Sequence, residues 1–266
     1  MKSFTLIALL LFFAISCQIR SDSARDEPSE VRPLTETPSL DGVERVTTRL
    51  SIGAGKLLVT GGASQLMEAD FEYNQESWKP EISFDQQDSE GKLTINQPGI
   101  SDDIDFDLGN NQRNEWRIRL NDEVEQELEC RIGAGETELD LQGLSLNRVD
   151  IDAGVGEHTI ILTNTSLPEF SLDAGIGEVN IDLSGTWRNN LRAEIDGGIG
   201  ELNLTVPSDV GVQLDVSGGL GSVDVPSSYT KDGNTYTNAA YDQAEYRLDI
   251  DVDAGMGSIE VEEIAE

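Results

Sequence analysis

The sequence has few of the residues on which most enzyme sites and nucleic-acid surfaces depend. It contains one histidine, two cysteines and 18 Lys and Arg residues, against 51 Asp and Glu residues. The resulting net charge of −33 argues against binding to nucleic acid and to anionic lipid, because like charges repel. One histidine cannot supply a three-histidine zinc site. Aromatic residues make up only 6% of the chain, so a packed core must be largely aliphatic.

A long unbroken apolar run occurs at the N-terminus. Residues 1–17 read "MKSFTLIALLLFFAISC", in which the apolar run 4–15 is too short for a permanent membrane helix and is typical of a signal peptide. Cys17 directly follows a small-residue site, and this ending resembles a bacterial lipobox. The resemblance implies a lipoprotein signal peptide over residues 1–16, cleavage before Cys17, and lipid attachment at Cys17 that anchors the protein to the membrane. The alternative is an ordinary secretory signal with an incidental cysteine.

A lipid anchor predicts a location in the bacterial cell envelope. Gln18 is not an inner-membrane retention signal of the Asp type, which favours an outer membrane where one exists. Residues 17–40 are polar, contain three prolines and lack an apolar period, so we expect a disordered tether there. Cys130 then has no cysteine partner in the mature chain, and its strand phase predicts a small buried hydrophobe.

The central feature of the sequence is a repeated motif, Gly-x-Gly, usually followed by Glu. It occurs in "IGAGETELDL", "DAGVGEHTIIL", "DAGIGEVNIDL", "DGGIGELNLTV", "SGGLGSVDV" and "DAGMGSIEV", and the first glycines lie 21, 21, 23, 21 and 36 residues apart. A nearly constant step of this size is typical of a solenoid, in which each repeat forms one coil stacked on the last. The sequence therefore predicts an all-β fold, a parallel β-helix or β-roll.

Each repeat changes its strand phase at the glycines. Leu172 and Ile176 share one phase and Val179 shares the other, which a straight strand could not bury together. We therefore expect a bend at Gly177–Glu178, where glycine permits unusual backbone angles. We also expect the residue between the glycines to fill the interior. That predicted interior column contains Ala134, Val155, Ile176, Ile199, Leu220 and Met256.

The repeats divide the chain into two predicted folded parts. Residues 41–120 read as a small β-rich region, and residues 121–266 as the solenoid. End coils need covering because unpaired strand edges aggregate. We expect the N-terminal region to cover one end, and the tyrosine-rich segment between Gly219 and Gly255 to cover the other.

Three parts of the sequence resemble known bacterial families. "LSIGAGKLLVTGGASQLMEADFEYN" with "WKPEISFD" is similar to the N-terminal toast-rack domain. "LDLQGLSLNRVDIDAGVGEHTIIL" resembles the repeat region related to LiaF-like proteins of the cell-wall-active antibiotic response, and "YTNAAYDQAEYRLDIDVDAGMGSIEV" resembles the endings of bacterial adhesins. The resemblance implies an all-β envelope protein, adhesin-like or linked to envelope stress, and supplies no catalytic residues.

Candidate chemistry is confined to acidic columns and a few single residues. Glu136, Glu157, Glu178 and Glu201 recur at one repeat position, and calcium would relieve their repulsion if they stack. The alternative is a solvated face without metal. Asp152, Asp173, Asp196 and Asp253 form a second column, expected to face outward or to cap the corner.

Two single residues are further candidates for chemistry or binding. His158 should point inward or toward a corner rather than act as a catalyst. Trp187 either packs over a coil end or projects from a loop toward a glycan or protein.

The sequence favours a non-enzymatic envelope lipoprotein, a scaffold or binding surface for an envelope protein or glycan, without a required cofactor. The alternative is a β-helix protein that binds glycans or processes them with paired carboxylates, which would need a deep groove, converging acids and a raised carboxyl pKa.

Overall fold

The computed structural model describes residues 32–36, 38–40, 42–99, 112–163 and 166–265. The predicted signal peptide, Cys17 and residues 17–31 of the expected tether lie outside this description. Apart from one short 3-10 turn, η1 (Glu76–Trp78), the secondary structure of the described residues is entirely β. In this part of the chain, no helix has the length and apolar character needed to cross a membrane.

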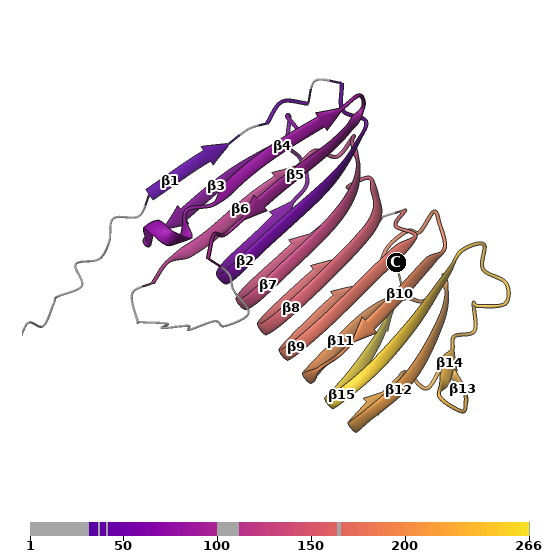
Figure 1. Ribbon diagram of the computed structural model, residues 1–266. Coiled ribbons are helices and arrows are strands. Elements are labelled where there is room, and N and C mark those ends of the chain that lie inside the picture. The colour runs from indigo at the N-terminus through magenta and orange to yellow at the C-terminus, as the bar shows by residue number, and fades with distance from the viewer. Residues whose placement is uncertain (1–31, 37, 41, 100–111, 164–165, 266) are drawn as a thin grey trace, which may run out of the picture.

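The strands belong to one large folded sheet (Figure 1). Their bounds are β1 (Arg32–Glu36), β2 (Arg45–Thr60), β3 (Met67–Tyr73), β4 (Glu81–Gln87), β5 (Glu90–Asn96), β6 (Asn114–Leu120), β7 (Glu125–Asp140), β8 (Leu146–Ile161), β9 (Glu169–Asp182), β10 (Leu191–Asp196), β11 (Ile199–Pro207), β12 (Gly211–Asp224), β13 (Thr230–Asp232), β14 (Thr235–Thr237) and β15 (Arg247–Ile264). β1 lies within the segment expected as a tether and pairs antiparallel with β3.

The repeats form a parallel stack, as the sequence predicts. β2, β7, β8 and β9 pair in parallel in that order, and β10 and β11 together make the next rung. The register places equivalent repeat positions side by side, for example Val155 beside Ile176. The predicted all-β solenoid is therefore confirmed.

Chain length requires each long strand to bend. β8 contains 16 residues, which would extend about 50 Å if straight at roughly 3.3 Å per residue. Only residues 162–168 separate it from β9, and so short a connection spans at most about 28 Å. Because β9 begins beside the start of β8, where Arg148 pairs with Glu169, the end of β8 must lie near its own start, and the two halves of the strand fold toward each other. We call the half before the glycines the first arm and the half after them the second arm.

The bend lies at the Gly-x-Gly motif, and the core fills the space between the arms. On β9, Leu172 and Ala174 of the first arm and Val179 and Ile181 of the second arm are all buried in one apolar cluster. The predicted change of phase is thus confirmed. Gly177 has a φ of 145°, a conformation that residues with side chains rarely adopt. A Cβ added there would lie 1.8 Å from the carbonyl oxygen of Gly156, so stacked corners require glycine.

The N-terminal end of the stack is closed by separate strands. β5 pairs in parallel with the first arm of β2, and β6 pairs in parallel with its second arm. β4 then pairs antiparallel with β5, and β3 with β6. The expected cover at this end therefore consists of two sheet extensions, one for each arm (Figure 1).

The C-terminal end departs from stacking in chain order. β15 lies between β11 and β12 and pairs in parallel with both, so the expectation that each repeat stacks on the one before it is wrong for the last two rungs. The two strands also differ in their second arms. β15 buries apolar residues on both arms, among them Val252 and Ile259, whereas the second arm of β12 offers Val223, which is 40% exposed. The strand with buried apolar residues on both arms is the one that is paired on both sides.

The tyrosine-rich segment covers part of the remaining edge, as expected. β14 pairs antiparallel with residues 213–215 of β12, and Tyr229, Tyr236 and Tyr246 pack partly buried against the core. Residues 217–224 of β12 pair with β15 on one side, and none of the described residues forms a strand on the other.

Candidate functional site: an exposed apolar row between acidic rows

The residues between the corner glycines face solvent rather than the core. Val155, Ile176, Ile199 and Met256 are 52%, 53%, 45% and 50% exposed. We call these four residues the apolar row. Ala134, at the same position on β7, is half-buried. The predicted interior column is therefore wrong at these four positions, and the side chain of Leu220 lies outside the description.

The width of the bend explains this correction. On β9, Ala174 is the last buried residue of the first arm and Val179 is the first of the second arm. The stretch 175–178 between them lies on the outer side of the corner. The alternation in the sequence predicts that Ile176 faces the same way as Leu172 and Ala174. The backbone already turns before Ile176, so its side chain faces solvent instead.

Register aligns the apolar row across consecutive strands. Val155 pairs with Ile176, Ile176 with Ile199, and Ile199 with Met256. At about 4.8 Å between strands, the four positions extend over roughly 14 Å. Glycines precede and follow each of them, so no side chains stand beside the row along the strand. The row is consequently uncovered on both flanks.

The first flanking row is made of glutamates. Glu136, Glu157, Glu178 and Glu201 are exposed and in direct register, as the sequence predicts; we call them the glutamate row. Lys56 forms an ion pair with Glu136 at one end, and Ser258 takes the next position at the other. Within the described ranges, no group of three or more His, Cys, Asp or Glu side chains is arranged to hold a metal ion.

The second flanking row is made of aspartates. Asp152, Asp173, Asp196 and Asp253 are exposed and in register, which confirms their predicted outward direction; we call them the aspartate row. Partial burial, followed by the charges of Asp196 and Asp152, raises the pKa of the Asp173 carboxyl above its ordinary value. An open depression of about 520 Å³ lies over this part of the sheet, and its lining is predominantly acidic.

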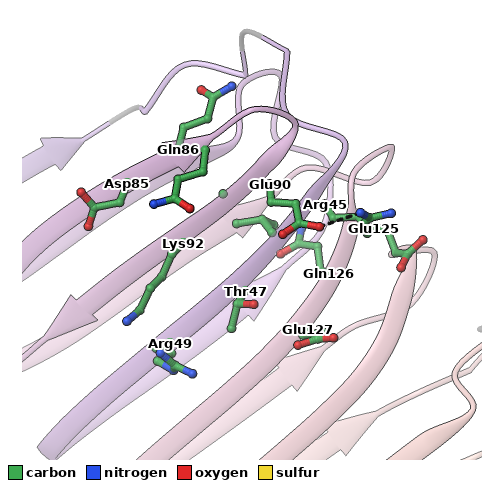
Figure 2. A pocket seen from close by; sticks show the side chains of 13 residues that line it. Arg45, Thr47, Arg49, Asp85, Gln86, Glu90, Lys92, Glu125, Gln126 and Glu127 are labelled. Atoms are coloured by element: carbon green, nitrogen blue, oxygen red, sulfur yellow. Dashed lines mark hydrogen bonds and ion pairs between the residues drawn. The ribbon is translucent and has the colours of Figure 1, made fainter.

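A larger depression lies on the first-arm face near the N-terminal end (Figure 2). It has a volume of about 690 Å³ and is lined by side chains from β2, β4, β5 and β7. Two of its cations are paired, Arg45 with Glu90 at 2.7 Å and Arg49 with Glu129, which lies outside the lining, at 2.6 Å. None of the described residues that line it is aromatic, so the stacking platform common in glycan sites is not present among them.

The single histidine is part of the core. His158 is 2% exposed and lies in the inward row beside Thr137 and Val179, as expected. Neither ring nitrogen has a hydrogen-bond partner, and neither does the Thr137 hydroxyl, among the described residues. Burial lowers the pKa of the His158 imidazole, which favours the neutral ring. No serine or carboxylate bonds to it that would complete a catalytic triad in this part of the chain.

Two further sequence candidates are structural. Cys130 is buried, and burial together with the nearby charge of Asp150 raises the pKa of its thiol, so it is an unreactive apolar group as predicted. Trp187 is also buried and donates its indole N–H to the carbonyl oxygen of Leu183 at 2.8 Å. Of the two alternatives for Trp187, packing is the correct one.

The bent parallel rungs and their outward rows define a β-solenoid protein. Residues 26–171 match the family model described as the N-terminal domain of toast_rack, DUF2154, which covers more than half of the chain. The protein therefore belongs to the toast-rack family. Residues 167–261 match the model for the C-terminal part of LiaF, a cell wall-active antibiotics response protein.

A solved structure with 29% sequence identity shares this architecture. A "putative cell adhesion protein" from Clostridium sporogenes ATCC 15579 is 29% identical and has a TM-score of 0.68, with 88% of this chain and 100% of that chain covered. A "putative adhesin" from Bacteroides fragilis NCTC 9343 is 11% identical and has a TM-score of 0.31, with 88% of this chain and 98% of that chain covered. Among curated proteins, none matches this sequence.

Proposed function

We propose that the protein is a non-enzymatic, lipid-anchored component of the bacterial cell envelope whose folded sheet binds a protein partner. The observation that carries the proposal is the apolar row, because four half-exposed apolar side chains in register are uncovered by the rest of the described chain. The similarity to LiaF and to a protein described as adhesive supports an envelope role.

The alternative of a glycan-binding or glycan-processing protein has less support. The depressions on the described surface are open, and the larger one has no aromatic lining. Asp173 does have a raised carboxyl pKa, but it belongs to a row that repeats on successive strands rather than to a single converging acid pair. Glycan processing would require such a pair at a defined separation.

Site-specific photocrosslinking in living cells tests the partner-binding proposal. A photoreactive amino acid at Ile176 should give a discrete crosslinked protein, whereas the same group at Glu81, an exposed residue of β4, should not. Crosslinking that is identical at both positions, or absent at Ile176, would contradict partner binding at the row.

Mass spectrometry of the mature amino terminus tests the anchor. We expect the protein to begin at a diacylglyceryl-modified Cys17, and Cys17→Ser to accumulate as uncleaved precursor. An unmodified terminus at another residue would contradict lipid anchoring without bearing on the binding surface.

A further inference from the structure

We propose that the corner surface docks a cationic amphipathic helix of the protein partner. The corner surface comprises the apolar row, the glycines beside it and the two acidic rows. This inference rests on the proposed function and specifies the chemistry of the partner. It follows from three properties of the surface: its exposed apolar centre, its unpaired charge and its spacing.

The centre of the surface is a continuous apolar strip. Ile176 and Ile199 occupy its middle, with Val155 and Met256 as their neighbours in register. About half of each side chain is exposed, although every strand around the row is paired. The glycines leave room for another molecule to approach the row closely from either side. Contiguous exposed apolar groups of this kind mark interaction sites.

Both flanks of the strip carry unpaired negative charge. β7 carries only the glutamate, Glu136, and β15 only the aspartate, Asp253. On the three rungs between them the aspartate lies three residues before the apolar residue and the glutamate two residues after it, as in Asp173, Ile176 and Glu178. These offsets correspond to about 10 Å and about 7 Å along the strand. Of the eight carboxylates, Glu136 is the one with an ion pair among the described residues. The surface is therefore complementary to an apolar stripe with basic side chains on both sides.

The same charges argue against other occupants. A second copy of the chain, with a net charge of −33, would bring acidic rows against acidic rows. An anionic membrane would be repelled in the same way. A neutral glycan would leave the unpaired carboxylates unmatched. A basic protein segment satisfies both the apolar and the charged parts of the surface.

The spacing between rungs favours a helix over an extended segment. Side chains of the apolar row recur about every 4.8 Å, and a helix lying along the row presents one apolar position per turn of about 5.4 Å. An extended segment presents side chains on one face about every 6.6–6.8 Å and falls out of step after two rungs. A helix of three turns thus matches the length of the row.

Fluorescence anisotropy with a defined peptide tests the inference on the folded chain. The probe is a labelled helix-forming peptide with one leucine stripe flanked by lysines, and its control has the same composition in scrambled order. We expect the striped peptide to bind more tightly than the scrambled one. The double variant Ile176→Ser, Ile199→Ser should weaken binding about tenfold or more, as expected for removal of central apolar contacts.

Charge and position have separate controls. The double variant Asp173→Asn, Glu178→Gln should weaken binding and flatten its salt dependence, whereas Glu81→Gln should change neither. Val223→Ser removes an exposed apolar side chain outside the row and should leave binding unchanged. Circular dichroism and thermal melts verify that each variant is folded.

The outcomes separate this inference from the proposed function. Equal binding of striped and scrambled peptides, or equal losses in the row and control variants, would overturn the helix-docking inference. If crosslinking at Ile176 in cells persists in that case, partner binding stands and the partner has another chemistry. If the peptide binds selectively but no cellular crosslink forms, the proposed function fails while the surface chemistry is upheld.

Discussion

Asn114 donates its side-chain amide to the side-chain oxygen of Gln97 at 2.9 Å, and the two buried residues together cap the first glycine corner of the stack. The backbone N–H of Gly53 donates to Gln97 at 3.0 Å, and Asn114 donates to the carbonyl oxygen of Ala54 at 2.6 Å. The indole N–H of Trp116 donates to Asn114 at 2.9 Å. The two side-chain amides thus bond to backbone groups of the first corner, which has no further Gly-x-Gly rung on this side.

Removal of this cap should be costly. Asn114→Ala would leave the Ala54 carbonyl and the Trp116 indole N–H without these partners, and we expect a loss of about 2 kcal/mol or more in unfolding free energy. Urea denaturation measures the loss. Gln87→Ala, which removes an exposed amide on β4, is the control and should change stability by less than about 0.5 kcal/mol. Similar losses in both variants would mean that the cap contributes little.

The direction of the corner residue can be tested on one strand. Leu172→Ala removes a buried side chain and should destabilise the protein by about 3 kcal/mol. Ile176→Ala shortens a half-exposed side chain and should cost less than about 1 kcal/mol. Chemical denaturation of the two variants gives the comparison. If Ile176→Ala lost more stability than Leu172→Ala, the assignment of Ile176 to the outer surface would be wrong.

Glycine at the corner should be irreplaceable. In Gly177→Ala the new methyl group would collide with the backbone of Gly156 on the preceding rung, and φ of 145° is strained for alanine. We expect a loss of about 3 kcal/mol or more, or failure to fold. Gly143→Ala is the matched control, since φ is 76° there and a Cβ would meet nothing within 4 Å. Its loss should be only about 1–2 kcal/mol. Thermal melts and expression yield distinguish the two.

His158 should make the stability depend on pH. Burial lowers its pKa in the folded state, so the unfolded chain takes up a proton first as the pH falls. The stability contribution of the neutral ring is therefore complete above the ordinary pKa of about 6.5 and is lost as the pH falls from there toward the lowered value. His158→Leu, which resembles Leu57 and Leu202 in the same row, should be more stable and should lose less stability between pH 7 and pH 5. The measurement is the unfolding free energy of both proteins as a function of pH. Equal losses in the two proteins between pH 7 and pH 5 would contradict this prediction.

The glutamate row should respond to ionic strength rather than to calcium itself. If the row is solvated, calcium chloride and sodium chloride at equal ionic strength should raise the melting temperature by similar amounts. Glutamine at Glu136, Glu157, Glu178 and Glu201 together should reduce both shifts alike. A calcium-specific shift that disappears in this four-fold variant would instead identify a metal site, because binding to the folded state adds stability with ligand concentration.

The sequence was sufficient to predict the rungs because each repeats the same alternation. Glu157 and Glu178 align as the repeat spacing indicates, and the unbroken alternation around Cys130 places that residue in the core. The side of the sheet on which the Ile176 side chain lies is not predictable in the same way. Inward and outward side chains alternate only along a straight strand, and the backbone turns at this position. The repeat period therefore predicts the acidic rows correctly but places the apolar row between them on the wrong side of the strand.

The order of the last two rungs also lies beyond sequence periodicity. A repeat spacing shows that β12 and β15 have similar forms, but does not show which of them neighbours β11. The signal that distinguishes them is the apolar content of the second arm, where β12 has an exposed Val223 and β15 has the buried pair Ile259 and Val261.

The place of β15 has a consequence for how the sheet is completed during synthesis. β12 leaves the ribosome before β15, yet its parallel neighbour is the last strand of the sheet. Until that strand arrives, β11 keeps an open edge and β12 has no rung on which to stack. The stack therefore cannot close progressively from the N-terminus, as a solenoid in chain order could. Closure instead waits for Arg247–Ile264, so a variant without this strand loses the neighbour of both β11 and β12.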